Sequence, residues 1–67
     1  MIFEVKVEET SMKTKTYYMY GYELRDLFKK IEGTEEFSIG QTHYLLSQIL
    51  VVNAKRIYLS EVRKINE

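Results

Sequence analysis

The 67-residue sequence contains no cysteine and a single histidine, His43. Without cysteine the fold can hold neither disulfides nor thiolate metal sites, and one histidine cannot build a zinc site alone. A chain of this length has room for one domain, residues 1–67, with one modest hydrophobic core. Self-association or partner binding is then the leading candidate for any extra stabilisation.

An excess of charge and a long apolar run are also missing. Ten basic and ten acidic residues give a formal net charge of zero, which points to no strongly charged partner. The longest aliphatic run, residues 49–52, is far too short to span a bilayer. Residues 1–5 lack the basic start and long apolar stretch of a signal peptide. We therefore expect a cytoplasmic protein that does not bind membranes.

Catalytic motifs are absent as well. The three glycines are isolated, so none belongs to a phosphate-binding loop, and no nucleophile elbow or His-Glu-x-x-His helix occurs. His43 has no orienting carboxylate beside it in the sequence. Glu35 and Glu36 are adjacent and would diverge on any regular element. The sequence predicts a binding protein that has no enzyme activity, no cofactor and no small-molecule substrate.

The N-terminal third has the pattern of a β-hairpin. Residues 2–8 alternate, with Phe3, Val5 and Val7 on one side and charged residues on the other, which is typical of a half-buried strand. Residues 14–20 are rich in β-branched and aromatic side chains and predict a second strand. The short polar connection between these segments favours antiparallel pairing.

An amphipathic helix is predicted over residues 22–32. Its apolar positions follow the spacing i, i+3, i+4, i+7 and comprise Leu24, Leu27, Phe28 and Ile31. Lysines fill the last turn, where the helix dipole favours positive charge. Gly33 stands where a C-terminal cap is expected.

Two interpretations compete for the C-terminal part. Phe37 and Ile39 indicate a short strand that ends at Gly40. Beyond it, residues 48–52 and 57–62 read as strands around a turn at 53–56, which would form a C-terminal β-hairpin. The alternative is one long helix with Thr42 as its N-cap and an apolar stripe of Val51, Ala54, Tyr58, Val62 and Ile65. The density of Ile and Val favours strands, so we expect a small α+β domain.

The most unusual feature is the aromatic run over residues 17–22, Tyr-Tyr-Met-Tyr-Gly-Tyr. In a strand, Tyr17 and Met19 share one face, whereas Tyr18 and Tyr20 share the other. If Tyr17 and Met19 face the helix, Tyr18 and Tyr20 face outward, where they either simply cover the sheet or form a binding surface. In the reverse register their hydroxyls would need buried partners.

These patterns define the candidate binding residues. Tyrosine combines a large rigid contact area with a polar tip and is enriched in protein interfaces. Lysines on the hairpin flank the tyrosines, and cations interleaved with aromatics are also found in nucleic-acid binders. We predict a host protein or a second copy of the chain as partner; the alternatives are a nucleic acid or a structural role in a homo-oligomer. The candidate residues are Tyr18, Tyr20, Tyr22, Lys6, Lys13 and Lys15.

Two resemblances rest on these segments. The order of elements and residues 52–62, Val-Asn-Ala-Lys-Arg-Ile-Tyr-Leu-Ser-Glu-Val, resemble small proteins of phages and mobile elements of Firmicutes. The Tyr-Tyr-x-Tyr strand at 17–20, followed by a helix, resembles the phage inhibitors of uracil-DNA glycosylase. Those inhibitors are acidic DNA mimics, whereas this chain is neutral. The resemblance implies a small phage or prophage protein that binds and inhibits a host enzyme in the host cytoplasm.

Overall fold

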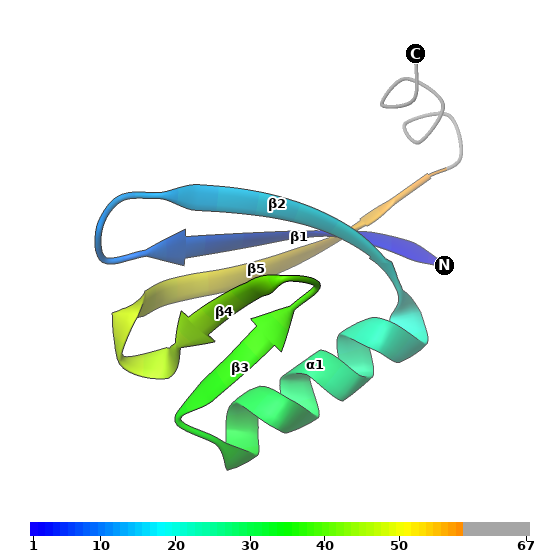
Figure 1. The fold of residues 1–67 in the computed structure, drawn as a ribbon. Helices are drawn as coiled ribbons and strands as arrows, with labels where there is room; N and C mark the ends of the chain where they lie inside the picture. Colours follow the sequence, from blue (N-terminus) through cyan, green and yellow to red (C-terminus); the bar gives the residue numbers. More distant parts are fainter. Residues whose placement is uncertain (59–67) are drawn as a thin grey trace.

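The computed structural model describes residues 1–58 and confirms an α+β fold with N-terminal strands, a helix and C-terminal strands (Figure 1). No helix within residues 1–58 is long and apolar enough to cross a membrane. In chain order the elements are β1 (Ile2–Glu9), β2 (Thr14–Tyr20), α1 (Gly21–Gly33), β3 (Glu36–Ile39), β4 (Thr42–Leu45), the 3₁₀ turn η1 (Leu46–Gln48) and β5 (Ile49–Ile57).

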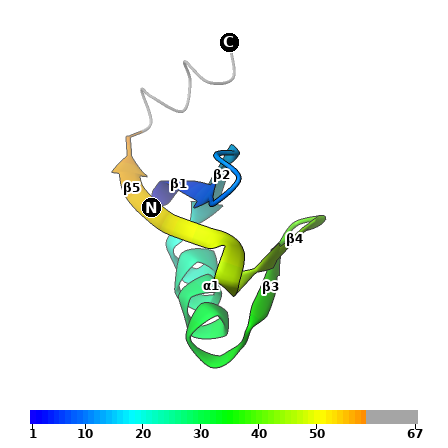
Figure 2. The same cartoon turned by 90° about the vertical axis from the view of Figure 1, so that its left-hand side faces the viewer.

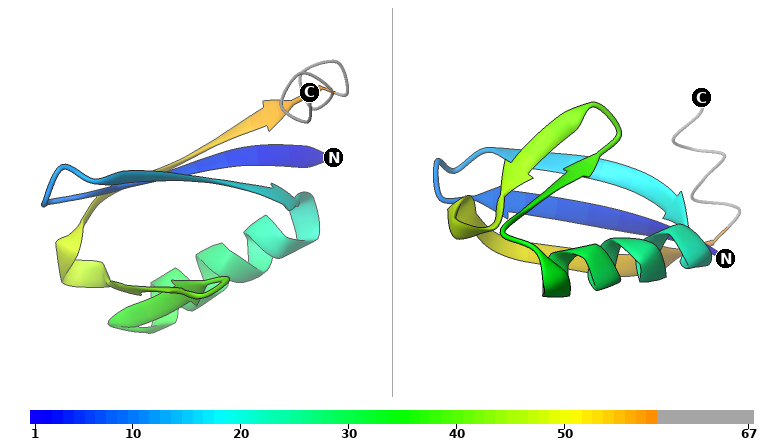
Figure 3. Two further views of the ribbon diagram at one scale, coloured as in Figure 1. Left: turned by 45° about the horizontal axis from the view of Figure 1, so that its top comes forward. Right: turned by 60° about the horizontal axis from the view of Figure 1, so that its bottom comes forward.

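Strand β1 is the centre of a three-stranded antiparallel sheet in the order β2-β1-β5. Strands β3 and β4 pair with each other in a separate hairpin. Viewed end-on, α1 and this hairpin lie together on one side of the sheet (Figure 2). The same two layers appear in Figure 3, where none of the described elements covers the other side of the sheet. We call these sides the inner face and the outer face.

The core lies between the sheet and the layer beneath it. Val5 and Val7 on β1 are completely buried, because they sit in the middle strand of the sheet with α1 and the β3–β4 hairpin beneath them. Buried side chains from the other elements complete the core, namely Met19, Leu24, Leu27, Phe37 and Tyr44. Three residues of the predicted helix stripe therefore face inward, with Ile31 partly buried, but Phe28 is 39% exposed.

The helix differs from its prediction at both ends. It begins at Gly21, where the backbone N–H of Tyr20 donates to Glu23 Oε1 at 3.2 Å. Gly33 is the last helical residue and not a left-handed cap, since Thr34 takes the capping position with an extended backbone. The Thr34 hydroxyl donates to the carbonyl oxygen of Lys30, 2.7 Å away, and so satisfies one of the helix's terminal acceptors.

The C-terminal part follows neither sequence interpretation completely. The long-helix alternative is wrong over residues 42–57, which form β4, η1 and β5. The predicted turn at 53–56 is also wrong, because β5 runs straight through it and pairs with β1, with Asn53 opposite Lys6. The predicted strand over 57–62 falls mainly in residues 59–67, outside the described part of the chain.

The β3–β4 hairpin was only half predicted. Phe37 and Ile39 do lie on a strand, but its partner is residues 42–45, which no sequence pattern singled out. The chain reverses at Gly40, whose φ of 61° lies in the left-handed region that glycine adopts most readily.

A pair of tyrosines links the hairpin to the sheet. The Tyr17 hydroxyl on β2 and the Tyr44 hydroxyl on β4 share a hydrogen bond of 2.5 Å. The Tyr44 ring also stacks on Phe37, with centroids 5.4 Å apart. The pKa of the Tyr44 phenol is raised well above its ordinary value. Burial is the larger cause, and the hydrogen bond to Tyr17 is the next.

Two neighbouring residues of α1 test the packing. Leu27 is 6% exposed and Phe28 39%, so truncation of Leu27 leaves a cavity that truncation of Phe28 does not. We expect Leu27→Ala to lower the free energy of unfolding by about 2–5 kcal/mol. For Phe28→Ala we expect a loss under about 1.5 kcal/mol. Urea denaturation followed by circular dichroism measures both; equal losses would contradict the packing described here.

The tyrosine pair makes stability depend on alkaline pH. The folded state holds the pKa of Tyr44 above the unfolded value of about 10. The contribution of Tyr44 to the free energy of unfolding is therefore complete below about pH 10 and is lost as the pH rises further. Tyr44→Phe should cost about 1 kcal/mol at neutral pH. The advantage of wild type over Tyr44→Phe should then shrink above about pH 10. Urea denaturation at several pH values tests this, with the exposed Tyr58→Phe as control; a constant difference across pH 8–11 would refute it.

Candidate functional site

The register of the β1–β2 hairpin decides where the tyrosines point. Tyr17 lies opposite Val5 and Met19 opposite Phe3, so both belong to the inner face. Tyr18 and Tyr20 therefore point to the outer face, where they are 46% and 52% exposed. The first of the two registers considered from the sequence is the one that occurs.

Tyr22 joins these two residues although it belongs to the helix. Helix α1 starts directly after β2, and the turn brings the Tyr22 ring parallel to the Tyr20 ring, with centroids 5.8 Å apart and planes 9° apart. Tyr22 is 66% exposed. We call Tyr18, Tyr20 and Tyr22 the tyrosine patch; it lies at the N-terminal end of α1.

The three candidate lysines are dispersed. Lys6 lies on the outer face, where its ammonium group is 3.7 Å from Glu4. Lys13 lies in the β1–β2 loop, at the opposite end of β2 from Tyr20, which is roughly 20 Å away along the strand. Lys15 belongs to the inner face, donates to Thr42 Oγ1 at 2.6 Å and lies over the Tyr17 ring. Only Lys6 therefore shares a surface with the tyrosine patch.

Charges of both signs alternate along the outer face beside the patch. Glu4 lies between Tyr18 on β2 and Lys55 on β5. In register, Lys6 and Glu8 follow as the next two outward-facing residues of β1. This part of the surface is mixed in charge, in keeping with the neutral sequence.

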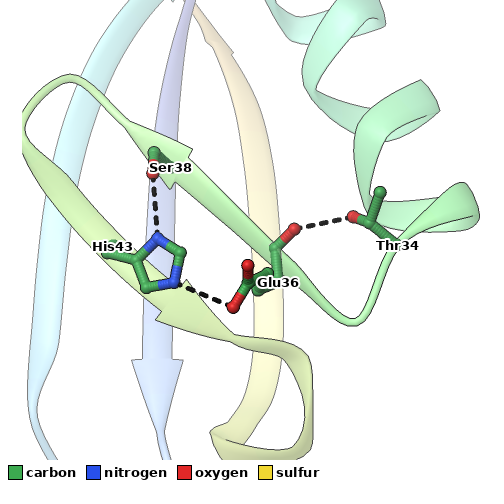
Figure 4. Close-up of polar contacts among 4 residues, drawn as sticks. All are labelled: Thr34, Glu36, Ser38 and His43. Atoms are coloured by element: carbon green, nitrogen blue, oxygen red, sulfur yellow. Dashed lines mark hydrogen bonds and ion pairs between the residues drawn. The ribbon is translucent and has the colours of Figure 1, made fainter.

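A polar cluster on the β3–β4 hairpin escaped the sequence prediction. Ser38 and His43 are direct cross-strand partners, and the Ser38 hydroxyl lies 3.1 Å from His43 Nδ1. His43 Nε2 lies 3.2 Å from Glu36 Oε2 (Figure 4). No carboxylate is adjacent to His43 in the sequence, but the hairpin brings Glu36 to the ring from seven residues away. The sequence feature that could have predicted the cluster is the position of Ser38 and His43, two residues before and three residues after the turn residue Gly40.

The order serine, histidine, carboxylate is that of a nucleophile, a base and an orienting acid. With Nε2 donating to Glu36, Nδ1 is the acceptor for the serine hydroxyl. Yet the side chains of His43 and Glu36 are both more than half exposed, so water competes for every one of these hydrogen bonds. The arrangement is that of a polar network that links β3 and β4. Residues 1–58 contain no group of three or more metal-ligating His, Cys, Asp or Glu side chains.

Comparison with known proteins adds no relative. The chain matches no family model, and searches of curated proteins and of solved structures find no match either.

The hairpin cluster can be tested directly as a catalyst. Because the cluster is solvated, we expect the protein to hydrolyse p-nitrophenyl acetate no faster than an equal concentration of free imidazole. Ser38→Ala should leave that rate unchanged, and His43→Gln should remove the imidazole background. A rate well above that of imidazole, lost in Ser38→Ala, would instead identify a catalytic serine.

Proposed function

We propose that this chain is a non-catalytic protein-binding domain that contacts its partner through the tyrosine patch. The observation that supports this best is the exposure of three neighbouring tyrosines, two of them stacked, at the edge of a sheet face that no element within residues 1–58 covers. Aromatic rings that are already fixed in place lose little conformational entropy when a partner covers them.

The tyrosines of β2 lie on both faces of the sheet. Tyr17 faces inward, packs against the core and hydrogen-bonds to Tyr44. The hydroxyls of Tyr18, Tyr20 and Tyr22 bond to no other side chain within residues 1–58, and all three residues are exposed. A ring with a free polar tip is the side chain that protein interfaces favour.

A protein suits this surface better than a nucleic acid. Phosphate binding needs a concentration of cations, but Glu4 and Glu8 alternate with Lys6 on the outer face. Lys15 is engaged by Thr42 on the other side of the sheet. Within this proposal, the resemblance to small phage proteins suggests a cytoplasmic host protein that the domain inhibits or modulates.

Removal of the rings tests the patch. Tyr18→Ala combined with Tyr20→Ala should abolish capture of the partner from a Firmicutes lysate, whereas wild type retains it. Because both side chains lie outside the core, circular dichroism should show an intact fold. Sedimentation velocity on the same samples shows whether the partner is a second copy of the chain.

Two control variants separate the alternatives. Tyr18→Phe with Tyr20→Phe keeps the rings and should retain most of the binding, since ring area contributes more than the hydroxyls. Phe28→Ala removes an exposed aromatic ring elsewhere and should bind as wild type does. Unchanged capture by the double alanine variant would eliminate the tyrosine patch as the binding surface.

A further inference from the structure

A concave surface lies at the C-terminal end of α1, away from the tyrosine patch. It is a hollow of about 960 Å³, formed where the chain leaves α1, enters β3 and later passes from β4 into η1. With 13 residues, α1 separates it from the tyrosine patch by roughly 20 Å. The hollow is lined by Thr34, Glu35, Glu36, Leu45, Leu46 and Ser47.

Two leucines give the hollow an apolar wall. Leu45 is 41% exposed and Leu46 36%, so both present aliphatic surface to solvent next to each other in the sequence. The backbone N–H of Leu46 donates to the carbonyl oxygen of Glu35 at 2.8 Å, and Leu45 pairs with Glu36 across the hairpin. These bonds fix the apolar wall against the acidic one, so the hollow is formed before anything enters it.

The charge of the lining has one sign. Glu35 and Glu36 contribute two carboxylates, and none of the six lining residues is basic. The C-terminal end of α1 lies directly before them, and the terminal carbonyls that Thr34 does not satisfy add partial negative charge. His43 occupies only Oε2 of Glu36, which leaves Oε1 for another donor.

We propose that this hollow binds a peptide segment of a partner protein that carries one lysine or arginine between aliphatic residues. The leucines accept the aliphatic side chains, and the two carboxylates accept the cation. The volume lies within the range of about 300–1,000 Å³ that is common for ligand sites. This site is independent of the tyrosine patch and extends the proposed function by a second point of contact.

A matched pair of peptides tests the proposal. Acetyl-Gly-Leu-Arg-Leu-Gly-amide and its Leu-Glu-Leu counterpart, each with a fluorescent label, are titrated with the full chain and followed by anisotropy. The arginine peptide should bind, and more weakly as salt increases, whereas the glutamate peptide should not bind. Free arginine at the same concentration should compete poorly, because it has no aliphatic neighbours for the leucines.

Variants locate the binding. Glu35→Gln with Glu36→Gln should raise the Kd of the arginine peptide about threefold to thirtyfold, as expected for two solvent-exposed ion pairs. Glu32→Gln removes a nearby carboxylate that does not line the hollow and should change nothing. Tyr18→Ala with Tyr20→Ala should also bind this peptide normally, so failure of the tyrosine patch and failure of the hollow remain distinguishable. Equal binding of both peptides, no binding, or an unchanged Kd in the glutamine variant would each overturn the proposal.

Discussion

The alternation of β1 is the constraint on which the other elements depend, because β1 is the strand that pairs with both of its neighbours. Val5 and Val7 are buried completely, and a slip of one residue would exchange them for charged neighbours. That register then fixes β2 on one side and β5 on the other. The outward position of Tyr18 follows from the burial of Val5, since Val5 pairs with Tyr17.

One residue type serves two purposes on a single strand. Tyr17 contributes to stability, because its ring packs on the core and its hydroxyl reaches Tyr44. Tyr18 and Tyr20, one residue away on either side of Met19, contribute little to the core. The hydrogen bond to Tyr44, together with burial of Phe37 and Tyr44 in the core, holds the hairpin against the sheet, although a hairpin of four-residue strands is marginal alone. The same hairpin then presents one wall of the acidic hollow.

Features set by neighbours in sequence could be predicted, and those set by distant partners could not. Alternation predicted β1, the β-branched and aromatic composition predicted β2, and the 3.6-residue period predicted α1. Asn53 is turn-prone, yet it lies within a strand because Lys6, 47 positions earlier, supplies a paired backbone. Ser38, His43 and Glu36 likewise meet only through the β3–β4 register. The spacing of the tyrosines was enough to propose them as a binding site. Lys15 could be removed from the candidate binding residues only once its contact with Thr42 was known.

The cost of leaving side chains exposed supports a binding role for both surfaces. Full burial of a large apolar side chain stabilises a protein by about 1.5–3 kcal/mol. A domain of fewer than 70–80 residues has a core that rarely supplies more than about 3–5 kcal/mol of net stability. Three tyrosines and two leucines at the two ends of α1 are between 36% and 66% exposed, so each leaves part of this free energy unused in the folded domain. Burial of these residues against the proposed partners would recover part of that free energy and so stabilise the fold.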